Sequence, residues 1–179
     1  MVTDVPEKLT ALFTEGNAHF RVIHHAPCEK SSASVAAVRG TELGQGAKSL
    51  CLTLKGNGVK MHVLAVLPSD KQADLSKISS AFGARRASLS SEDEVFEFTG
   101  CILGAVPPVS FHPELTLAAD PLLFSRYEEI AFNAGRRDLS VIIRAADFAR
   151  IVQPKLIAFS RDNDANSRQV IPASENARV

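Results

Sequence analysis

The stretch Ala47-Lys-Ser-Leu-Cys-Leu-Thr-Leu-Lys-Gly-Asn-Gly-Val-Lys-Met-His-Val-Leu-Ala-Val-Leu67 decides the fold. It contains two apolar runs, residues 47–54 and 61–67, on either side of the dipeptide Asn57-Gly58. Asn and Gly both tolerate the positive φ angles of a tight two-residue turn. The stretch therefore predicts an antiparallel β-hairpin with its turn at this dipeptide.

The segments outside this hairpin show a mixture of helical and strand patterns. Helical spacing or capping residues predict helices at 4–15, 33–38, 73–82, 92–98 and 146–152. Short strands are expected at 19–24, 115–119, 129–132 and 140–143. Ser31 or Ser32 would cap the second helix, and Gly40 would end it. Because the order has no regular βαβ rhythm, we expect an α+β fold rather than a doubly wound sheet.

Length and composition indicate one globular domain. The chain has 179 residues, 45% of them hydrophobic, which is enough for one core. We expect the domain to span residues 1–159 and the polar, aperiodic segment 160–179 to be a disordered tail. Lys and Arg together number 20, as do Asp and Glu, so no bulk positive field would hold nucleic acid. DNA is not an expected partner, and any contact with RNA must be local.

The sequence also indicates a location and a redox state. The start of the chain lacks the basic and apolar regions of a secretory signal, and no apolar run is long enough to cross a membrane. Three widely spaced cysteines, Cys28, Cys51 and Cys101, form no disulfide pattern. We therefore expect reduced, buried thiols in a cytoplasmic protein.

Three familiar kinds of site can be compared with the sequence: a phosphate-binding loop, a metal site and a nucleophilic cysteine. The segment Gly44–Ser49 resembles a phosphate-binding loop, but Ala47 stands where that pattern requires glycine, and the apolar strand follows the segment instead of preceding it. The histidines are scattered, and the adjacent His24 and His25 would point to opposite faces of a strand, so no metal site is expected. A nucleophilic Cys101 stays open as an alternative, although a lone cysteine is usually a small buried hydrophobe.

Two features remain as candidates for a functional site, and neither contains an obvious nucleophile. Lys48 follows a glycine-bearing turn at the start of the first apolar run, and residues 100–108 form a loop rich in glycine and proline. Lys48 could equally be a solvated surface residue, and the loop could be an ordinary connection.

Three segments, in this order and spacing, resemble the YbaK family. They are Arg39-Gly-Thr-Glu-Leu-Gly-Gln-Gly-Ala-Lys48, Thr99-Gly-Cys-Ile-Leu-Gly-Ala-Val-Pro-Pro108 and Phe132-Asn-Ala-Gly-Arg-Arg-Asp-Leu-Ser140. The resemblance covers about residues 5–155. This family includes the editing domain inserted in bacterial prolyl-tRNA synthetases and freestanding proteins that remove wrong amino acids from tRNA. The resemblance implies a mixed, partly barrel-like sheet surrounded by helices.

The resemblance also implies an activity. The chain is most similar to the freestanding branch that deacylates Ser-tRNA or Thr-tRNA. Deacylation of Ala-tRNA or Cys-tRNA, or a noncatalytic module that binds tRNA or a synthetase, are the alternatives. The partner would be the acceptor end of a mischarged tRNA, with an aminoacyl-tRNA synthetase as a further partner, and neither metal nor cofactor is expected.

By this resemblance, Lys48 is the lysine needed for activity and Asn133 belongs to the segment that closes the pocket. Residues Gly100 and Pro107 belong to the loop that lines the pocket. An ester carbonyl needs mainly a placed water and donors for the developing oxyanion, and backbone N–H groups can serve. The candidate donors are Gly104 and Ala105.

The remaining expectations concern polar contacts. Lys48, with an ordinary pKa, would be a poor base but a good anchor for a phosphate or carbonyl oxygen. A hydroxyl of the substrate would be bound by one of Thr99, Ser110 and His112. Phosphate contacts are expected, if anywhere, at the paired arginines Arg85, Arg86, Arg136 and Arg137.

Overall fold

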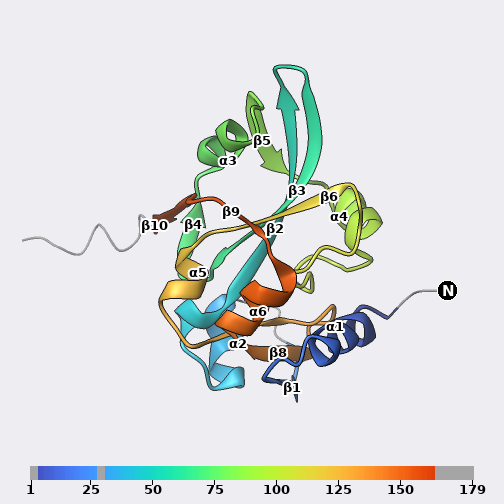
Figure 1. Ribbon diagram of the computed structural model, residues 1–179, viewed down its shortest axis with the longest axis vertical. Coiled ribbons are helices and arrows are strands. Elements are labelled where there is room, and N and C mark those ends of the chain that lie inside the picture. Colours follow the sequence, from blue (N-terminus) through green and yellow to red (C-terminus); the bar gives the residue numbers. More distant parts are fainter. Residues whose placement is uncertain (1–3, 28–30, 164–179) are drawn as a thin grey trace, which may run out of the picture.

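The computed structural model of the protein, shown in Figure 1, describes residues 4–27 and 31–163. The helices are α1 (Val5–Glu15), α2 (Ser32–Arg39), the short 3-10 helix η1 (Leu43–Gln45), α3 (Leu75–Ala81), α4 (Glu92–Thr99), α5 (Leu122–Ser125) and α6 (Ala145–Val152). The strands are β1 (Phe20–His24), β2 (Ala47–Gly56), β3 (Val59–Pro68), β4 (Lys71–Ala73), β5 (Arg86–Leu89), β6 (Leu115–Ala119), β7 (Glu129–Asn133), β8 (Leu139–Arg144), β9 (Lys155–Leu156) and β10 (Ser160–Asp162). The α+β class predicted from the sequence is confirmed.

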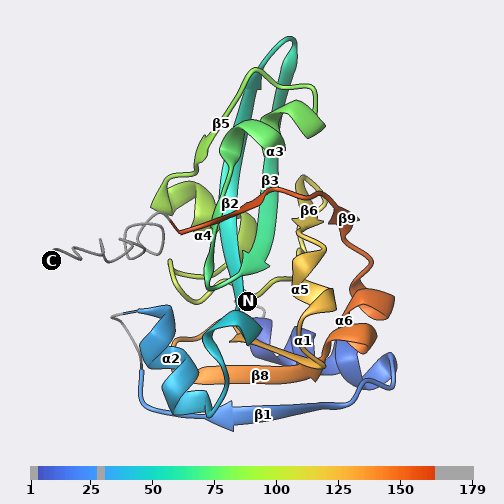
Figure 2. The same ribbon diagram turned by 90° about the vertical axis from the view of Figure 1, so that its left-hand side faces the viewer.

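The predicted hairpin forms the longest pair of strands. β2 and β3 are paired along their whole length, from Ala47 opposite Pro68 to Gly56 opposite Val59. Asn57 and Gly58 have φ angles of 55° and 77°, which is the conformation that the turn required. In Figure 2 the hairpin runs from the base of the molecule to its opposite, projecting end.

Two main sheets are arranged around this hairpin. The five-stranded sheet has the order β5-β2-β3-β6-β9, in which β6 and β9 run parallel to their neighbours, and the three-stranded sheet β1-β8-β7 is antiparallel. Figure 2 shows the three-stranded sheet at the base of the molecule, below the hairpin. A single bridge between Gly46 and Ala131 joins the two sheets. Within the described residues the strands do not close into a barrel. The barrel-like character implied by the resemblance is limited to this bridge between the two sheets.

The middle of the hairpin is largely apolar, and both of its faces are covered there. One face, with Cys51, Leu64 and Val66, packs into a core shared with the three-stranded sheet and α4. The other face, with Leu52 and Val63, packs against α3 and the chain end near β10. Figure 1 shows α3 and α4 on opposite sides of the hairpin. Alternate residues of β2 thus point into two different cores.

Most predicted elements form within a residue or two of their expected bounds, and the main differences lie around β4 and β10. The helix predicted at 73–82 begins at Leu75, because Asp74 accepts the N–H groups of Ser76 and Lys77 as its N-cap. Residues Lys71–Ala73 instead form β4, which pairs with β10. The predicted tail therefore does not begin at Ser160, and its residues 164–179 lie outside the described part of the chain.

Asp120 attaches the end of the described chain to the core. It is buried, and its carboxylate accepts the N–H groups of Phe159 and Ser160 at 2.8 and 2.7 Å. Burial alone would raise the pKa of this carboxyl, but these N–H groups and that of Leu122 hold the pKa below its usual value. The ionised carboxylate is therefore part of what fixes β10 against β4.

Candidate functional site

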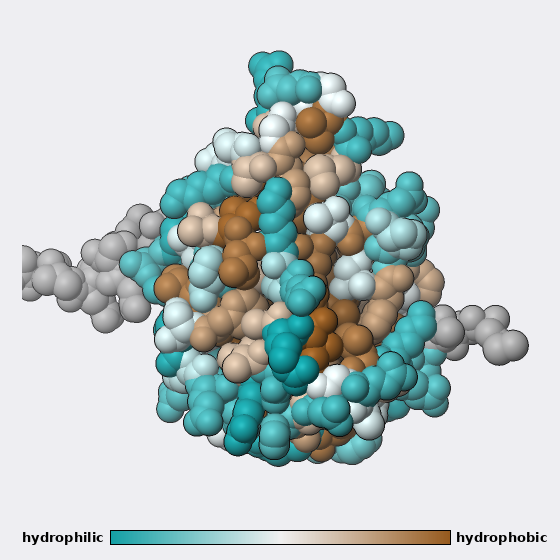
Figure 3. Space-filling model, viewed as in Figure 1, coloured by the Kyte–Doolittle hydropathy of each residue, from teal (hydrophilic) through white to brown (hydrophobic). Residues whose placement is uncertain are grey.

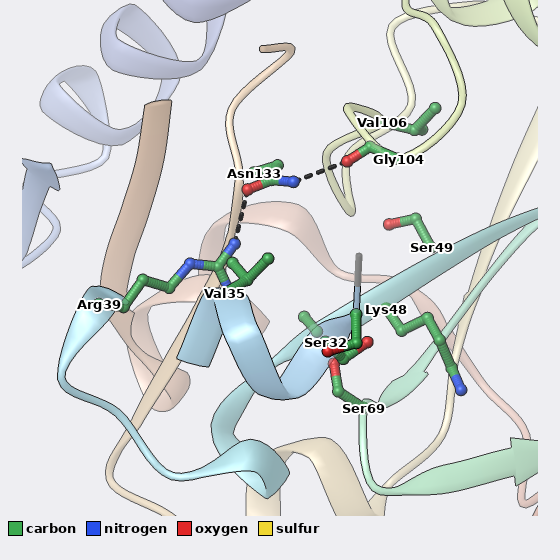
Figure 4. Close-up of a pocket in the computed structure, with 11 residues that line it drawn as sticks. Ser32, Val35, Arg39, Lys48, Ser49, Ser69, Gly104, Val106 and Asn133 are labelled. Carbon is green, nitrogen blue, oxygen red and sulfur yellow. Dashed lines mark hydrogen bonds between the residues drawn. The ribbon is translucent and has the colours of Figure 1, made fainter. Parts of the chain in front are cut away.

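A cavity of about 240 Å³ opens at the base of the hairpin, where β2 begins. Its wall comes from α2, the start of β2, the end of β3, the loop after α4 and the end of β7. Figure 4 shows its lining residues. They are Ser31, Ser32, Val35, Arg39, Ala47, Lys48, Ser49, Ser69, Gly104, Val106 and Asn133. The cavity brings together residues from all three segments that carry the family resemblance.

Lys48 lines the cavity, but its side chain is already engaged. Its Nζ donates a hydrogen bond to the backbone carbonyl of Lys71, at 2.7 Å, and Figure 4 shows it directed away from Asn133 and Gly104. Burial lowers the pKa of Lys48, and the nearby carboxylate of Asp70 acts in the opposite direction. The expectation of an ordinary pKa was therefore wrong. An ammonium has three donors, so the bond to Lys71 leaves two for a ligand.

Ser49 enters the cavity from the opposite face of β2. Successive residues of a strand point to opposite sides, so Ser49 is turned away from the side on which Lys48 meets β4. Its Oγ is buried and has no hydrogen-bond partner among the described residues. In Figure 4 this oxygen is directed toward the space beside Gly104. A buried hydroxyl without a partner is uncommon, because desolvating it costs free energy.

Asn133 and Arg39 form a polar network beside Ser49. The Asn133 Nδ2 donates to the carbonyl of Gly104 at 2.6 Å, and its Oδ1 accepts from the Arg39 Nη2 at 2.7 Å. The Arg39 Nε also donates to the Ser140 Oγ at 2.8 Å, and His25 lies 2.7 Å from the same hydroxyl. This network joins α2, β7, β8 and the loop after α4 into one rigid wall.

The loop after α4 is held by its backbone. Gly104 has a φ of 83°, which favours glycine, and Arg137 donates two hydrogen bonds, of 3.2 and 2.8 Å, to the carbonyl of Leu103. Ala105 is buried, and its N–H donates to the carbonyl of Ile102 at 3.1 Å. The Ala105 N–H is therefore used inside the loop, which argues against its predicted role as an oxyanion donor. At Gly104, the contact that the structure records is made by the carbonyl, not by the N–H.

Three residues predicted to bind a substrate hydroxyl or line the pocket lie outside the cavity wall. The Thr99 hydroxyl donates to the carbonyl of Val95 at 2.6 Å and accepts the N–H of Cys101. Gly100 ends α4 in the left-handed conformation, and Pro107 is buried in the loop. These residues shape the loop rather than the cavity, because their groups are used locally.

Ser110 and His112 are also placed elsewhere. The Ser110 Oγ donates within its own loop, to the carbonyl of Leu115 at 2.6 Å. The His112 Nδ1 accepts the N–H of Glu114, and its ring packs edge-on against Phe98. The three predicted hydroxyl partners are thus not among the residues that line the cavity, which presents Ser49 and its neighbours instead. The sequence offered one hint, since Ser49 directly follows Lys48 at the start of a largely apolar run.

The thiols of the described region are unsuited to nucleophilic chemistry. Cys101 is 2% exposed, and burial raises its pKa. Burial, with a smaller contribution from Cys101, raises the pKa of Cys51 to about 11. Because the thiolate is the reactive form, both side chains are inert at neutral pH. Cys28 lies outside the described residues.

Within residues 4–27 and 31–163, no group of three or more His, Cys, Asp or Glu side chains is arranged to hold a metal ion. In the same part of the chain, no helix is both long and apolar enough to cross a membrane.

Comparison with known proteins places this geometry in a family. Residues 25–151 match the family described as the aminoacyl-tRNA editing domain. The chain belongs to the aminoacyl-tRNA editing domain family. The predicted family is therefore confirmed, and the match includes every residue of the cavity wall.

Two relatives show how this editing domain is used elsewhere. The chain is 56% identical, over 155 residues, to the multifunctional Ser/Thr-tRNA deacylase ProXp-y of Escherichia coli (strain K12), which covers 87% of this chain and 92% of that protein. It is 29% identical, over 96 residues, to the proline--tRNA ligase of Trichlorobacter lovleyi, covering 54% of this chain and 16% of that enzyme. The editing domain here thus matches nearly all of the first protein and a small part of the second.

Solved structures show the same fold. The crystal structure of the hypothetical protein APE2540 has a TM-score of 0.75 at 21% identity and covers 86% of this chain and 99% of its own. A candidate trans-editing enzyme for prolyl tRNA synthetase has a TM-score of 0.73 at 20% identity, covering 89% and 98%. These structures confirm the editing-domain fold expected from the resemblance.

Proposed function

We propose that this protein is a trans-editing deacylase that hydrolyses the ester of mischarged Ser-tRNA or Thr-tRNA. The observation that carries the proposal is the buried Ser49 hydroxyl, which has no partner among the described residues and is directed into the cavity. The 56% identity to a Ser/Thr-tRNA deacylase supports the same substrates. The partner is the acceptor end of the tRNA, and the protein acts in the cytoplasm, beside the synthetase whose errors it removes.

The size of the cavity favours a small amino acid. A volume of about 240 Å³ lies below the usual range for drug-sized ligands, which begins at roughly 300 Å³. Serine and threonine carry a hydroxyl that can bond to the Ser49 Oγ. An alanyl group would leave this oxygen buried and unpaired, and sites built in this way reject the analogue by up to roughly 10⁴–10⁵-fold. The cavity therefore selects by polarity as well as by size.

The reaction is the addition of water to an ester. The water oxygen bonds to the carbonyl carbon, the bond from this carbon to the ribose oxygen breaks, and the ribose oxygen takes up a proton. The products are the free amino acid and a tRNA with its terminal hydroxyl restored. The neighbouring hydroxyl of the terminal ribose directs the water, so the cysteines are not needed and no covalent intermediate forms. The role of the protein is to position the ester.

We assign positioning to the two faces of β2. Ser49 binds the amino-acid side chain inside the cavity, and the ammonium of Lys48 binds an oxygen of the ester or of the terminal phosphate at the rim. Asn133 holds Gly104 through its carbonyl, which fixes the loop against which the aminoacyl group rests. In this proposal, β2 binds the amino-acid side chain and an oxygen of the ester or phosphate, and the loop after α4 supports the aminoacyl group.

The test is deacylation of purified Ser-, Thr-, Ala- and Cys-charged tRNA by the full chain. We expect rapid loss of serine or threonine and slow loss of alanine. Preferential loss of alanine or cysteine would keep the enzyme class and overturn the substrate assignment. Hydrolysis of none, with tRNA binding intact, would make the protein a noncatalytic binding module. Activity that a chelator removes and zinc restores would contradict the metal-free mechanism.

The extent of the catalytic unit is also open to test. We propose that the editing domain, predicted to span residues 1–159, extends through β10 to Asp162 and that the segment beyond β10 is dispensable for chemistry. A chain ending at Asn163 keeps the β4–β10 pairing and should deacylate like the full chain. Loss of activity on this truncation would show that residues 164–179 take part.

A further inference from the structure

Four cations gather at the end of the hairpin opposite the cavity. They are Lys55, Lys60, Arg85 and Arg86, and all four are exposed. Lys55, Arg85 and Arg86, with Gly56, line an open hollow at this end. Hydrophilic side chains gather at the same projecting end of the molecule in Figure 3. The local charge contrasts with a chain whose net charge is zero.

Three of these cations form a row across adjacent strands. Lys55 in β2 is directly opposite Lys60 in β3 and directly opposite Arg86 in β5. Residues paired in this way share one face of the sheet, with Cβ atoms about 4.5–5.5 Å apart. We call Lys60, Lys55 and Arg86 the basic row.

This arrangement of like charges lowers the stability of the isolated protein. Like charges placed directly opposite each other destabilise a pair of strands. Within residues 4–27 and 31–163, none of the four cations forms a salt bridge. The nearby Glu94 is held mainly by Ser91 of its own capping box, and Lys55 makes only a small contribution to lowering its pKa. The charges in the row are therefore available to an external anion.

The hairpin keeps this row at a fixed distance from the cavity. Ser49 and Lys55 lie on the same face of β2, and six residues at about 3.4 Å each separate them by about 20 Å. α4 covers the face between them through Val95 and the stacking of Phe98 on His62. A ligand that reaches both places must be long and must carry negative charge where it meets the basic row.

We propose that the basic row is a second contact for tRNA, which binds phosphates of the RNA backbone while the aminoacyl end occupies the cavity. This inference rests on the proposed function for the identity of the RNA. It explains how a chain without net positive charge can hold a tRNA through local contacts. Phosphate contacts of this kind give affinity without reading the sequence, which suits an enzyme acting on more than one tRNA.

The test compares two triple variants of the full chain by their binding to uncharged tRNA over a range of salt concentrations. The first, Lys55→Gln/Lys60→Gln/Arg86→Gln, removes the row. The second removes three cations elsewhere, at Lys8, Arg144 and Lys155, and serves as the control for net charge. We expect the row variant to bind about tenfold more weakly at low salt and its dependence of log K on log salt to fall by about 2–3, whereas the control variant changes little. Thermal melting confirms that both variants fold.

Equal affinity and equal salt dependence of the two variants would overturn the proposal. A row variant that binds tRNA normally but self-associates would also overturn it and assign the charges to protection of the edge strand β5. Normal tRNA binding together with lost binding to vesicles rich in anionic lipid would assign the row to a membrane surface. Because binding uses uncharged tRNA, the result does not depend on deacylation. A wild type that binds through the row but hydrolyses no ester would refute the proposed function alone.

Discussion

The two ends of the β2–β3 hairpin are built from the same strands but use them differently. At the base, the Ser49 Oγ is buried without a partner among the described residues and Lys48 has a lowered pKa, so both carry the cost of burial. At the tip, Lys55 and Lys60 are exposed, and their cost is mutual repulsion across the strands. The middle of the hairpin supplies stability through two apolar cores. Both proposed contacts with the tRNA thus lie where the hairpin leaves the core, and each end should respond differently to substitution.

The largest expected effect is at the base, on catalysis. Lys48→Ala should lower the single-turnover rate of Ser-tRNA deacylation by roughly 10²–10³-fold, as removal of one electrostatic contact to a transition state does. Lys77→Ala, an exposed lysine of α3, is the matched control and should keep the wild-type rate. A Lys48→Ala protein that melts normally and deacylates at the wild-type rate would remove this lysine from the mechanism.

The next effect separates specificity from stability. Ser49→Ala should lower the rate on Ser-tRNA by roughly 10–100-fold, the equivalent of about 1–3 kcal/mol for an unpaired buried polar group, and raise the slow rate on Ala-tRNA, because no buried oxygen is then left unpaired. The same variant should be as stable as wild type or more stable, because it removes a buried hydroxyl without a partner. Rates that fall equally on both tRNAs would show that Ser49 shapes the cavity without reading the substrate.

A smaller effect concerns the pH profile. Asp70 raises the pKa of Lys48 against the effect of burial, so Asp70→Asn should lower that pKa further. If activity requires the ammonium, it falls as pH rises through the pKa of Lys48, and in the variant this fall should begin at lower pH. Rates are corrected for spontaneous ester hydrolysis, and Asp162→Asn, which removes a neighbouring exposed carboxylate, is the control. An unshifted profile would separate Asp70 from catalysis.

The same carboxyl should also affect stability in acid. The hydrogen bond from Arg126 holds the pKa of Asp70 below its usual value, although burial opposes it. A carboxyl with a lowered pKa in the folded state stabilises the protein above its unfolded pKa, and this stability disappears as pH falls through the folded pKa. The difference in stability between wild type and Asp70→Asn should therefore shrink in acid, which urea unfolding at several pH values would measure.

The smallest effect is expected at the tip. Lys60→Gln removes one side of the like-charged pair with Lys55 and should stabilise the fold by about 0.2–1 kcal/mol, most clearly at low salt. Urea unfolding measures it, with Lys77→Gln as control. A destabilised Lys60→Gln protein would mean that the lysine makes a structural contribution and would weaken the contrast between the two ends.

The sequence predicted what depends on local chemistry. The hairpin followed from Asn57-Gly58 between two apolar runs, and α4 from a capping serine at 90 or 91, of which Ser91 is the N-cap. The strand β4 was not predicted, because Lys71–Ala73 pairs with Ser160–Asp162, which lies far away in the chain. No local pattern reveals that pairing.

The candidate site shows the same limit. The resemblance placed Lys48, Gly104 and Asn133 together, and all three line the cavity. Ser49 could not be ranked above other serines, because lacking a partner is a property of the folded surroundings. Ala105 failed as a donor because its N–H closes a turn with Ile102, a detail of loop geometry that composition does not contain.

Successive side chains of β2 point to alternate faces of the sheet, and this limits how the distance between the cavity and the basic row can change. If one residue were inserted in each strand between Ser49 and Lys55, the basic row would move to the other side of the sheet from Ser49. Longer or shorter versions of this hairpin that keep both contacts must therefore differ by two residues per strand, or about 7 Å. The distance between the cavity and the basic row can thus change only in steps of about 7 Å, and a redesign for a different RNA geometry would have to use those steps.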